Sequence, residues 1–337
     1  MQNLMEKFGV PSASIALIEG FKIKNLEVYG SKSKVSNEQE PVTPQTLFQA
    51  ASISKPLTSI AILREVEAGN LSLDEMVNSF LESWKISNSN CVDCDEVTIR
   101  HLLSHSAGVT VEGFQGYEKE DELPSLLNIL DGNGTANSGR VFVDTPVGKS
   151  FRYSGGGYLV LQRLLEDKFS TPFSDYMKEN IFAPLGLELP TFEQPLPPCR
   201  LNEIAYGNTE GSNSKEKYHI YPELAAAGLW TNARDLALIM IDVQKSLNND
   251  SGVLLSQNQA KLMLSSTVEK EVGLGYLLYT NYFSHSGWNE GYSSNFIAHK
   301  EDGYGLVVLT NANKPEFINQ LTDQFLTSEG WDELRLP

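Results

Sequence analysis

The stretch Phe48-Gln49-Ala50-Ala51-Ser52-Ile53-Ser54-Lys55 joins a short, largely apolar run to a long helical pattern. The pattern extends from residue 56 to about residue 68, and its apolar residues recur at the three- and four-residue spacing that predicts a helix. The pair Gly69-Asn70 ends it. A helix that begins at this point places Ser52 and Lys55, three residues apart, on one face of its first turn.

Outward from this stretch, β-prone runs lie at both ends of the chain and helical patterns lie in the middle. Residues 12–18 and 22–29 predict a hairpin around Glu19-Gly20. Further strands are predicted at residues 273–280, 282–286, 294–299 and 305–310, and helices at residues 98–104, 156–167, 234–247 and 315–328.

This order predicts an α+β fold, an α/β sandwich of the β-lactamase/transpeptidase-like kind named below. One antiparallel sheet is built from both termini and flanked by helices, with a mainly helical region inserted. We expect residues 1–68 plus 226–337 to form the sheet domain and residues 69–225 the inserted domain. An active site would then lie in the cleft between them.

The composition excludes several classes of protein. Apolar residues make up 41% and charged residues 20% of the chain, which is ordinary for a globular protein. The net charge of −17 disfavours binding to nucleic acid or to an anionic membrane. No apolar run reaches the roughly 18 residues of a membrane span. The N-terminus lacks a signal-peptide pattern, so we expect a cytoplasmic protein, or a periplasmic or secreted one if a signal peptide has been removed. No pattern indicates an oligomeric state.

Three short segments carry residues suited to nucleophilic catalysis. The Ser52 hydroxyl is a weak nucleophile until a base takes its proton, and a desolvated Lys55 can serve as that base. Tyr153 stands on a Gly-rich stretch before a helical pattern, where it can pass protons between nucleophile and leaving group. The run 285–288, His-Ser-Gly-Trp, lies at the end of a predicted strand whose N–H groups can bind an oxyanion or an extended substrate. Taken singly, the first two segments are more typical of a surface Ser and Lys and of a packed aromatic residue, and the third is also typical of a hairpin turn.

A second pattern concerns metal binding. Cys91 and Cys94 form a Cys-x-x-Cys pair, and His101 and His105 follow with the spacing of neighbours on one helical face. The gap of six residues between the pairs is short for a zinc finger, and one Cys-x-x-Cys pair is weak evidence. We therefore favour two surface cysteines and two locally hydrogen-bonded histidines over a zinc site, and expect neither a metal nor a cofactor.

In this order, the three catalytic segments resemble the motifs of the penicillin-recognising serine hydrolases. These motifs are Ser-x-x-Lys at a helix start, Tyr-x-Asn on a loop and Lys/His-Thr/Ser-Gly on a strand. The group includes class C β-lactamases, D,D-carboxypeptidases, family VIII esterases and D-amino-acid-specific peptidases. The resemblance extends from about residue 10 to about residue 325, with supporting matches at residues 48–55, 69–74, 99–108, 227–236 and 307–311.

The resemblance implies a role for each matching residue. Ser52 would be the acylated nucleophile, and Lys55 and Tyr153 would share the general-base and general-acid roles. The N–H groups of Ser52 and Trp288 would form the oxyanion hole, and His105 would hold its loop in place. We expect the substrate and oxyanion site to be lined by His285, Ser286, Gly287, Trp288 and Gly155, and further by the loops at 110–140 and 205–225.

Two positions depart from the family pattern. Gly155 stands where the motif has Asn, and glycine cannot offer the Asn amide to substrate or to lysine. His285 stands where β-lactamases have Lys, and histidine is mostly neutral at pH 7. Together with the net charge of −17, the missing cation favours neutral or cationic substrates.

The sequence thus predicts a serine hydrolase that acts through an acyl-enzyme on a small-molecule ester, amide or peptide. Carboxylic esters rank first, D-amino-acid peptides second and β-lactams third, and a Tyr-based, class C-like route is preferred. A β-lactamase or D,D-carboxypeptidase is one alternative. A slow-acylating penicillin-binding or ligand-sensing module, favoured by the loss of Asn at Gly155, is another.

Overall fold

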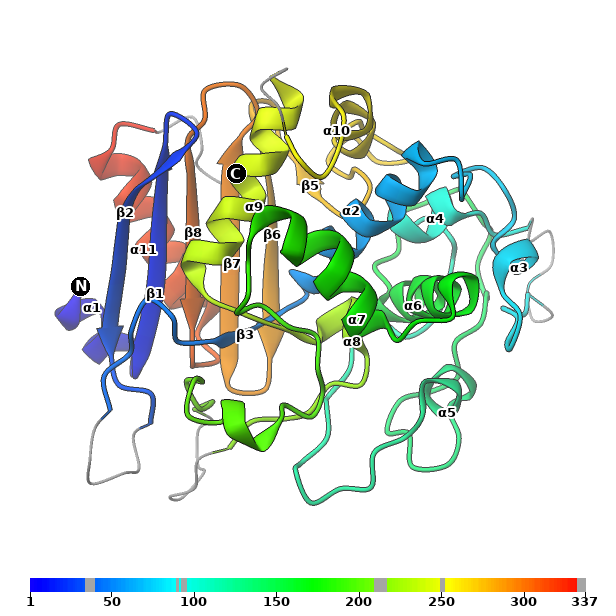
Figure 1. Cartoon of the computed structure of the whole chain (residues 1–337), viewed down its shortest axis with the longest axis horizontal. Coiled ribbons are helices and arrows are strands. Elements are labelled where there is room, and N and C mark those ends of the chain that lie inside the picture. Colours follow the sequence, from blue (N-terminus) through cyan, green and yellow to red (C-terminus); the bar gives the residue numbers. More distant parts are fainter. Residues whose placement is uncertain (34–39, 89–90, 92–95, 209–216, 249–251, 332–337) are drawn as a thin grey trace.

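The computed structural model describes the chain except residues 34–39, 89–90, 92–95, 209–216, 249–251 and 332–337. A six-stranded antiparallel sheet forms one side of the molecule, and most helices lie on the other side (Figure 1). Its strand order is β2-β1-β8-β7-β6-β5, so the two ends of the chain meet where β1 pairs with β8. The strands are β1 (Ser12–Glu19), β2 (Lys22–Gly30), β5 (Leu277–Leu278), β6 (Tyr282–Asn289), β7 (Tyr292–His299) and β8 (Gly305–Thr310).

The predicted N-terminal hairpin is confirmed, and its turn explains its register. Gly20 and Phe21 both have positive φ, 59° and 61°, as the tightest hairpin turns require. Along β1, Ile15 and Leu17 pack on one face of the sheet, while Ala16 and Ile18 pack on the other. The strand is therefore apolar throughout, because both faces of the sheet are covered.

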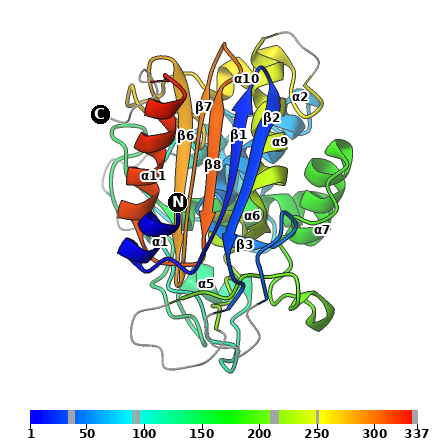
Figure 2. The same ribbon diagram turned by 90° about the vertical axis from the view of Figure 1, so that its left-hand side faces the viewer.

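Different helices cover the two faces. Helices α1 (Gln2–Phe8) and α11 (Pro315–Ser328) lie on one face, and α9 (Ala233–Leu247) lies on the other (Figure 2). The remaining α-helices are α2 (Ser54–Glu67), α3 (Val77–Phe80), α4 (Ile99–Leu103), α5 (Leu126–Asp131), α6 (Gly155–Phe169), α7 (Phe173–Met177), α8 (Leu224–Ala227) and α10 (Gln257–Met263). Short π and 3-10 turns span Lys178–Phe182, Ala183–Leu185 and Pro198–Arg200.

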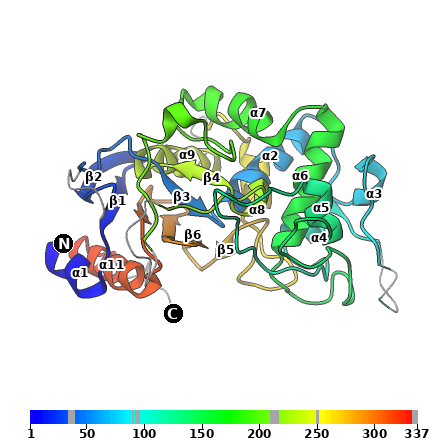
Figure 3. The ribbon, with the colours of Figure 1, turned by 90° about the horizontal axis from the view of Figure 1, so that it is seen from below.

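Helix α2 runs through the interior and carries the predicted nucleophile at its N-terminal end. Residues 54–63 are buried on every side, which is why this helix shows little polar face. A small two-stranded sheet, β3 (Phe48–Ala51) with β4 (Leu229–Thr231), leads into it. Seen from below, β3 and α8 lie between the large sheet and the helices α4–α6 (Figure 3).

The α+β architecture is as predicted, with two differences along the C-terminal strands. The strand predicted at 273–280 is only Leu277–Leu278. Gly275 interrupts it, because this residue has a φ of 83° and packs so closely against Ser59 of α2 that a Cβ atom would lie 2.1 Å from Ser59 Oγ. Strand β6 continues three residues further than predicted, to Asn289, so the segment 285–288 lies within the strand and not at its end.

The division into a sheet domain and an inserted helical domain stays a prediction. One hydrophobic core contains Ile18 and Leu309 of the sheet together with Leu102 and Leu164 of the middle region. In the parts of the chain described here, no helix combines the length and the apolar character needed to cross a bilayer.

Candidate active site

Ser52 sits on the turn between β3 and α2. The residue before it, Ala51, has a φ of 51°, in the left-handed region that L-residues rarely adopt. Ser54 fixes this turn: its Oγ donates to the Ala51 carbonyl at 2.6 Å and accepts from the Leu229 N–H of β4 at 3.0 Å. The serine is therefore held at a strained, well-anchored corner, as functional residues often are.

Lys55 lies one turn further along and faces Ser52. Its side chain is almost completely buried, with 2% exposure. The Nζ atom donates to Ser52 Oγ at 3.0 Å and to the Ala226 carbonyl at 2.8 Å. The predicted Ser–Lys pair is thus in direct contact in the interior, where a lysine can exchange a proton with the serine hydroxyl.

Tyr153 completes a compact group around the lysine. Lys55 Nζ lies 4.8 Å from the centre of the Tyr153 ring. The ring of His105 stacks on Tyr153 at 4.4 Å between centroids. The His105 Nδ1 atom accepts a hydrogen bond from the Ser154 N–H at 3.0 Å. His105 therefore links its own loop to the Tyr153 segment, in agreement with the structural role that the resemblance implied.

The residues of the third motif alternate along β6, where Ser286 and Trp288 are exposed and His285 and Gly287 are buried. Ser286, Gly287 and Trp288 line the cavity described below, and Trp288 is 53% exposed there. Only glycine fits at position 287, because a Cβ atom there would lie 2.3 Å from the Ala50 carbonyl oxygen. Strand β5 pairs only with Phe283 and Ser284, so among the described strands none borders the β6 edge beyond Ser284.

His285 is buried, with its ring 6.4 Å from the Tyr153 ring between centroids, and it is not among the described residues that line the cavity. Its Nδ1–H donates to the Ser286 carbonyl oxygen at 2.7 Å. Burial, together with the nearby positive charge of Lys55, lowers the pKa of His285 to about 3. Burial also lowers the pKa of His105 well below its usual value, so both imidazoles are neutral at pH 7.

Close contacts with Phe114 and Glu112 explain why position 155 is a glycine. A Cβ atom on Gly155 would lie 2.8 Å from Cε2 of Phe114 and 3.0 Å from the carbonyl oxygen of Glu112. The Gly155 N–H donates to that same carbonyl at 2.9 Å. The space in which the family's Asn side chain would begin is therefore filled by Phe114.

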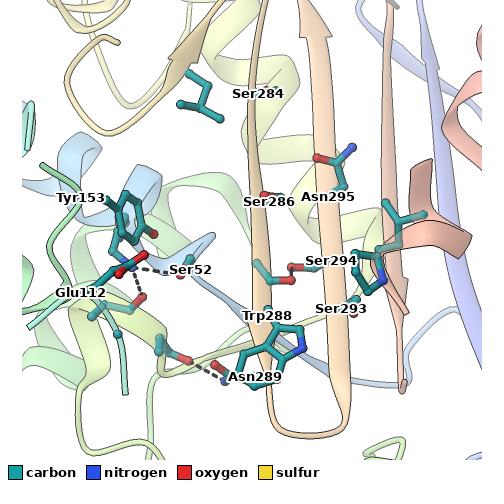
Figure 4. Close-up of a pocket in the computed structure, with 18 of the residues that line it drawn as sticks. Ser52, Glu112, Tyr153, Ser284, Ser286, Trp288, Asn289, Ser293, Ser294 and Asn295 are labelled. Carbon is teal, nitrogen blue, oxygen red and sulfur yellow. Dashed lines mark hydrogen bonds between the residues drawn. The ribbon is translucent and has the colours of Figure 1, made fainter. Parts of the chain in front are cut away.

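These residues surround a cavity of about 720 Å³. Its lining brings Ser52, Lys55, Tyr153 and the β6 residues together, as Figure 4 shows for the labelled side chains. Of the expected loops, 110–140 contributes residues 112–115, and 205–225 contributes none of its described residues. Ala226 and Ala227 follow directly after the second loop and do line the cavity.

The sequence did not predict that Glu112 and Phe114 in particular line the cavity. It also did not predict the hydrogen bonds by which Asn289 of β6 bridges to β3 and α8. Asn289 Nδ2 donates to Gln49 Oε1 at 2.8 Å and to the Ala227 carbonyl at 3.1 Å, tying β6 to β3 and α8. No local motif signals this bridge. The glycine at 155 is the one indication that another side chain fills the space of the missing Asn.

The Cys/His pattern has another explanation than a metal site. Cys91 is disulfide-bonded, which the sequence did not predict, and Cys94 lies outside the described residues. His101 Nδ1 accepts from the Thr98 N–H at 3.2 Å as part of a helix cap. Both histidines are locally hydrogen-bonded, and a disulfide sulfur is not a thiolate ligand.

Comparisons with known proteins agree with this geometry. A sequence model of the Beta-lactamase family matches residues 1–328. Protein flp of Staphylococcus aureus (strain MW2) is 24% identical over 336 residues, and the match covers 97% of this chain but only 64% of flp. This chain therefore spans less than two thirds of the length of that relative.

Two solved structures share the fold. The octameric penicillin-binding protein homologue from Pyrococcus abyssi has a TM-score of 0.74 and 23% identity, covering 93% of this chain and 72% of that one. A beta-lactamase/D-alanine carboxypeptidase from Yersinia pestis has a TM-score of 0.73 and 17% identity, covering 97% and 96%.

Proposed function

The chain belongs to the Beta-lactamase family, and on this premise we propose that it is a serine hydrolase that forms an acyl-enzyme on Ser52. Its substrate is a carboxylic ester or a small amide. One observation carries the proposal: the buried Lys55 Nζ lies 3.0 Å from Ser52 Oγ in a cavity that Tyr153 also lines. A serine without a base at this distance would be a poor nucleophile.

These positions support the following reaction. The basic member of the Lys55–Tyr153 pair, a neutral amine or a phenolate, takes the Ser52 proton as Oγ attacks the substrate carbonyl. The N–H groups of Ser52 and Trp288 stabilise the oxyanion. The proton passes to the leaving group as its bond to the carbonyl carbon breaks, which leaves the acyl group on Ser52. The same pair then deprotonates a water molecule, which attacks the carbonyl carbon of the acyl-enzyme ester. The carboxylic acid product leaves, and the proton returns to Ser52 Oγ.

The charges around Ser52 support neutral over anionic substrates. A lysine in place of His285 would be a permanent cation, whereas His285 has a pKa of about 3 and stays neutral. A substrate carboxylate would therefore find no second positive charge beside Lys55 among the described lining residues. This places β-lactams, which carry a carboxylate, third, after carboxylic esters and D-amino-acid peptides.

A second function is favoured by the filled space at Gly155. If the missing Asn amide limits deacylation, the protein acylates slowly and serves as a ligand-sensing or penicillin-binding module. The two functions differ in kinetics: an enzyme turns over many equivalents, whereas a sensing module releases one equivalent of product in a burst.

An activity panel tests the proposal. Short p-nitrophenyl esters, D-amino-acid p-nitroanilides and nitrocefin are compared for the wild type and for Ser52→Ala. We expect steady-state hydrolysis of at least one ester and its loss in the variant. Equal turnover by Ser52→Ala would disprove the proposal, and a burst without steady state would favour the sensing module.

A further inference from the structure

The segment Glu112-Gly113-Phe114-Gln115 forms a wall of the cavity. All four residues line it, and Figure 4 shows Glu112 beside Tyr153 and Ser52, across the cavity from β6. The segment belongs to none of the three catalytic motifs. Any part it takes in the reaction must come from its position next to them.

Hydrogen bonds fix this wall to the start of α6. The Ser154 hydroxyl donates to the Thr110 carbonyl at 2.9 Å, and the N–H groups of Gly155 and Gly156 donate to the carbonyls of Glu112 and Val111, each at 2.9 Å. Val111 has a φ of 64°, a conformation that β-branched residues rarely adopt. Such strain persists only where the surroundings enforce it. Glu112 is therefore held at a defined position relative to Tyr153.

The wall presents a carboxylate to the cavity. Phe114 blocks the space of a side chain at position 155, so this wall presents no amide from that position. Glu112 is exposed to the cavity, and its carboxylate has no hydrogen-bond or ion-pair partner among the residues that the structure describes. It is thus free to contact a ligand.

No other charged group among the described lining residues forms an ion pair with this carboxylate. Lys55 is the one lysine or arginine among the described lining residues, and its Nζ is already engaged with Ser52 and Ala226. The histidines next to it are neutral at pH 7. A ligand with a positive charge would be attracted to Glu112, and one with a negative charge would be repelled.

We propose that Glu112 is a specificity-determining residue that binds a protonated amine on the acyl donor, so that the preferred substrates are esters or amides of amino acids with a free ammonium group. The inference rests on the proposed function, since it assumes that Ser52 is acylated. The sequence favours neutral or cationic substrates, and this inference restricts the preferred class to substrates that carry an amine.

The test uses a set of benzyl esters with one leaving group and matched acyl groups. Benzyl esters of D- and L-alanine carry an ammonium group, benzyl isobutyrate replaces it with an isosteric methyl group, and monobenzyl succinate carries a carboxylate. Each is assayed with the wild type, Glu112→Gln and Glu112→Lys. Glu120→Gln is the control, because Glu120 is an exposed acid nearby that does not line the cavity.

We expect Glu112→Gln to lower the ratio of kcat/KM for one alanine ester over isobutyrate by about fivefold, the upper range for a solvent-exposed ion pair. Glu120→Gln should leave the ratio unchanged, and added salt should reduce the wild-type preference. Glu112→Lys should shift the preference toward the succinate ester. Comparing variants cancels the intrinsic difference in ester reactivity.

The outcomes separate this inference from the proposed function. If isobutyrate is hydrolysed at the wild-type rate by Glu112→Gln but the alanine ratio does not change, the role of Glu112 is refuted and the hydrolase stands. An equal loss in the Glu120→Gln control also refutes it. If no ester acylates Ser52, the proposed function fails, and this inference fails with it.

Discussion

Asparagine at position 155 would restore the family motif, but the structure predicts that this chain cannot accept it as it stands. In Gly155→Asn, the new Cβ atom would lie 2.8 Å from Phe114 Cε2 and 3.0 Å from the Glu112 carbonyl oxygen. The rest of the side chain would extend further into the same space. Overpacking of this kind costs about 1–3 kcal/mol, and the partly buried Phe114 ring can move, so we expect a loss of roughly 1–2 kcal/mol.

A double-mutant cycle assigns this loss to the Phe114 contact. The free energy of unfolding is measured by urea denaturation for the wild type, Gly155→Asn, Phe114→Ala and the double variant. In the Phe114→Ala background, the Gly155→Asn substitution should cost less than about 0.5 kcal/mol, which gives a coupling energy of about 0.5–2 kcal/mol. Gly113→Asn is the matched control, because no atom lies within 4 Å of a Cβ built on Gly113.

Two results would refute this reasoning. Gly155→Asn could be as stable as the wild type, which would mean that the wall is not tightly packed. Alternatively, it could cost the same with and without Phe114, which would place the strain elsewhere. The double variant also carries the restored amide beside Tyr153. A faster deacylation in this variant alone would support the view that Gly155 limits turnover.

Three further predictions concern the catalytic group. Lys55→Met should lower the rate of Ser52 acylation by about 10²–10⁴ in stopped-flow assays, while the circular dichroism spectrum stays native; a rate within tenfold of the wild type would refute the role of Lys55. Because burial and Lys55 lower the pKa of His285 from 6.5 to about 3, the unfolded chain binds a proton below pH 6.5 that the folded chain does not. The wild type should therefore lose about 2 kcal/mol more unfolding free energy than His285→Asn between about pH 8 and about pH 5 in urea titrations, and equal losses would contradict this. Gly287→Ala brings a methyl group to 2.3 Å from the Ala50 carbonyl and should lower stability by about 1–3 kcal/mol together with acylation, and an unchanged melting curve would show that β6 can shift freely.

Local patterns made most of the fold predictable. The β-prone runs at 12–18 and 22–29, the Glu19-Gly20 turn between them and the helical pattern at 315–328 each depend on a few neighbouring residues, and all three predictions agree with the observed elements. The strand expected at 273–280 was too long because Gly275 packs against Ser59, more than 200 residues away in the sequence. Strand length thus depended on a tertiary contact that periodicity does not contain.

The candidate site likewise combines local contacts, which the sequence predicts, with tertiary contacts, which it does not. The Ser52–Lys55 contact is local, since the first turn of a helix brings residues three apart together. That this pair lies together with Tyr153 and β6 around one cavity could be predicted only through the resemblance to a known family. The position of Glu112 was not predictable, because it depends on a left-handed Val111 and on hydrogen bonds from the start of α6. Sequence preference alone argues against that conformation for valine.

The central claim is that Ser52 is the nucleophile, and identifying the acylated residue tests it most directly. The protein is treated with a fluorophosphonate probe, or with a short p-nitrophenyl ester and rapid acid quench, and then analysed by intact-mass and peptide mass spectrometry. We predict one adduct per chain on the peptide that contains Ser52, and none in Ser52→Ala. An adduct on another residue, or equal labelling of Ser52→Ala, would contradict the account.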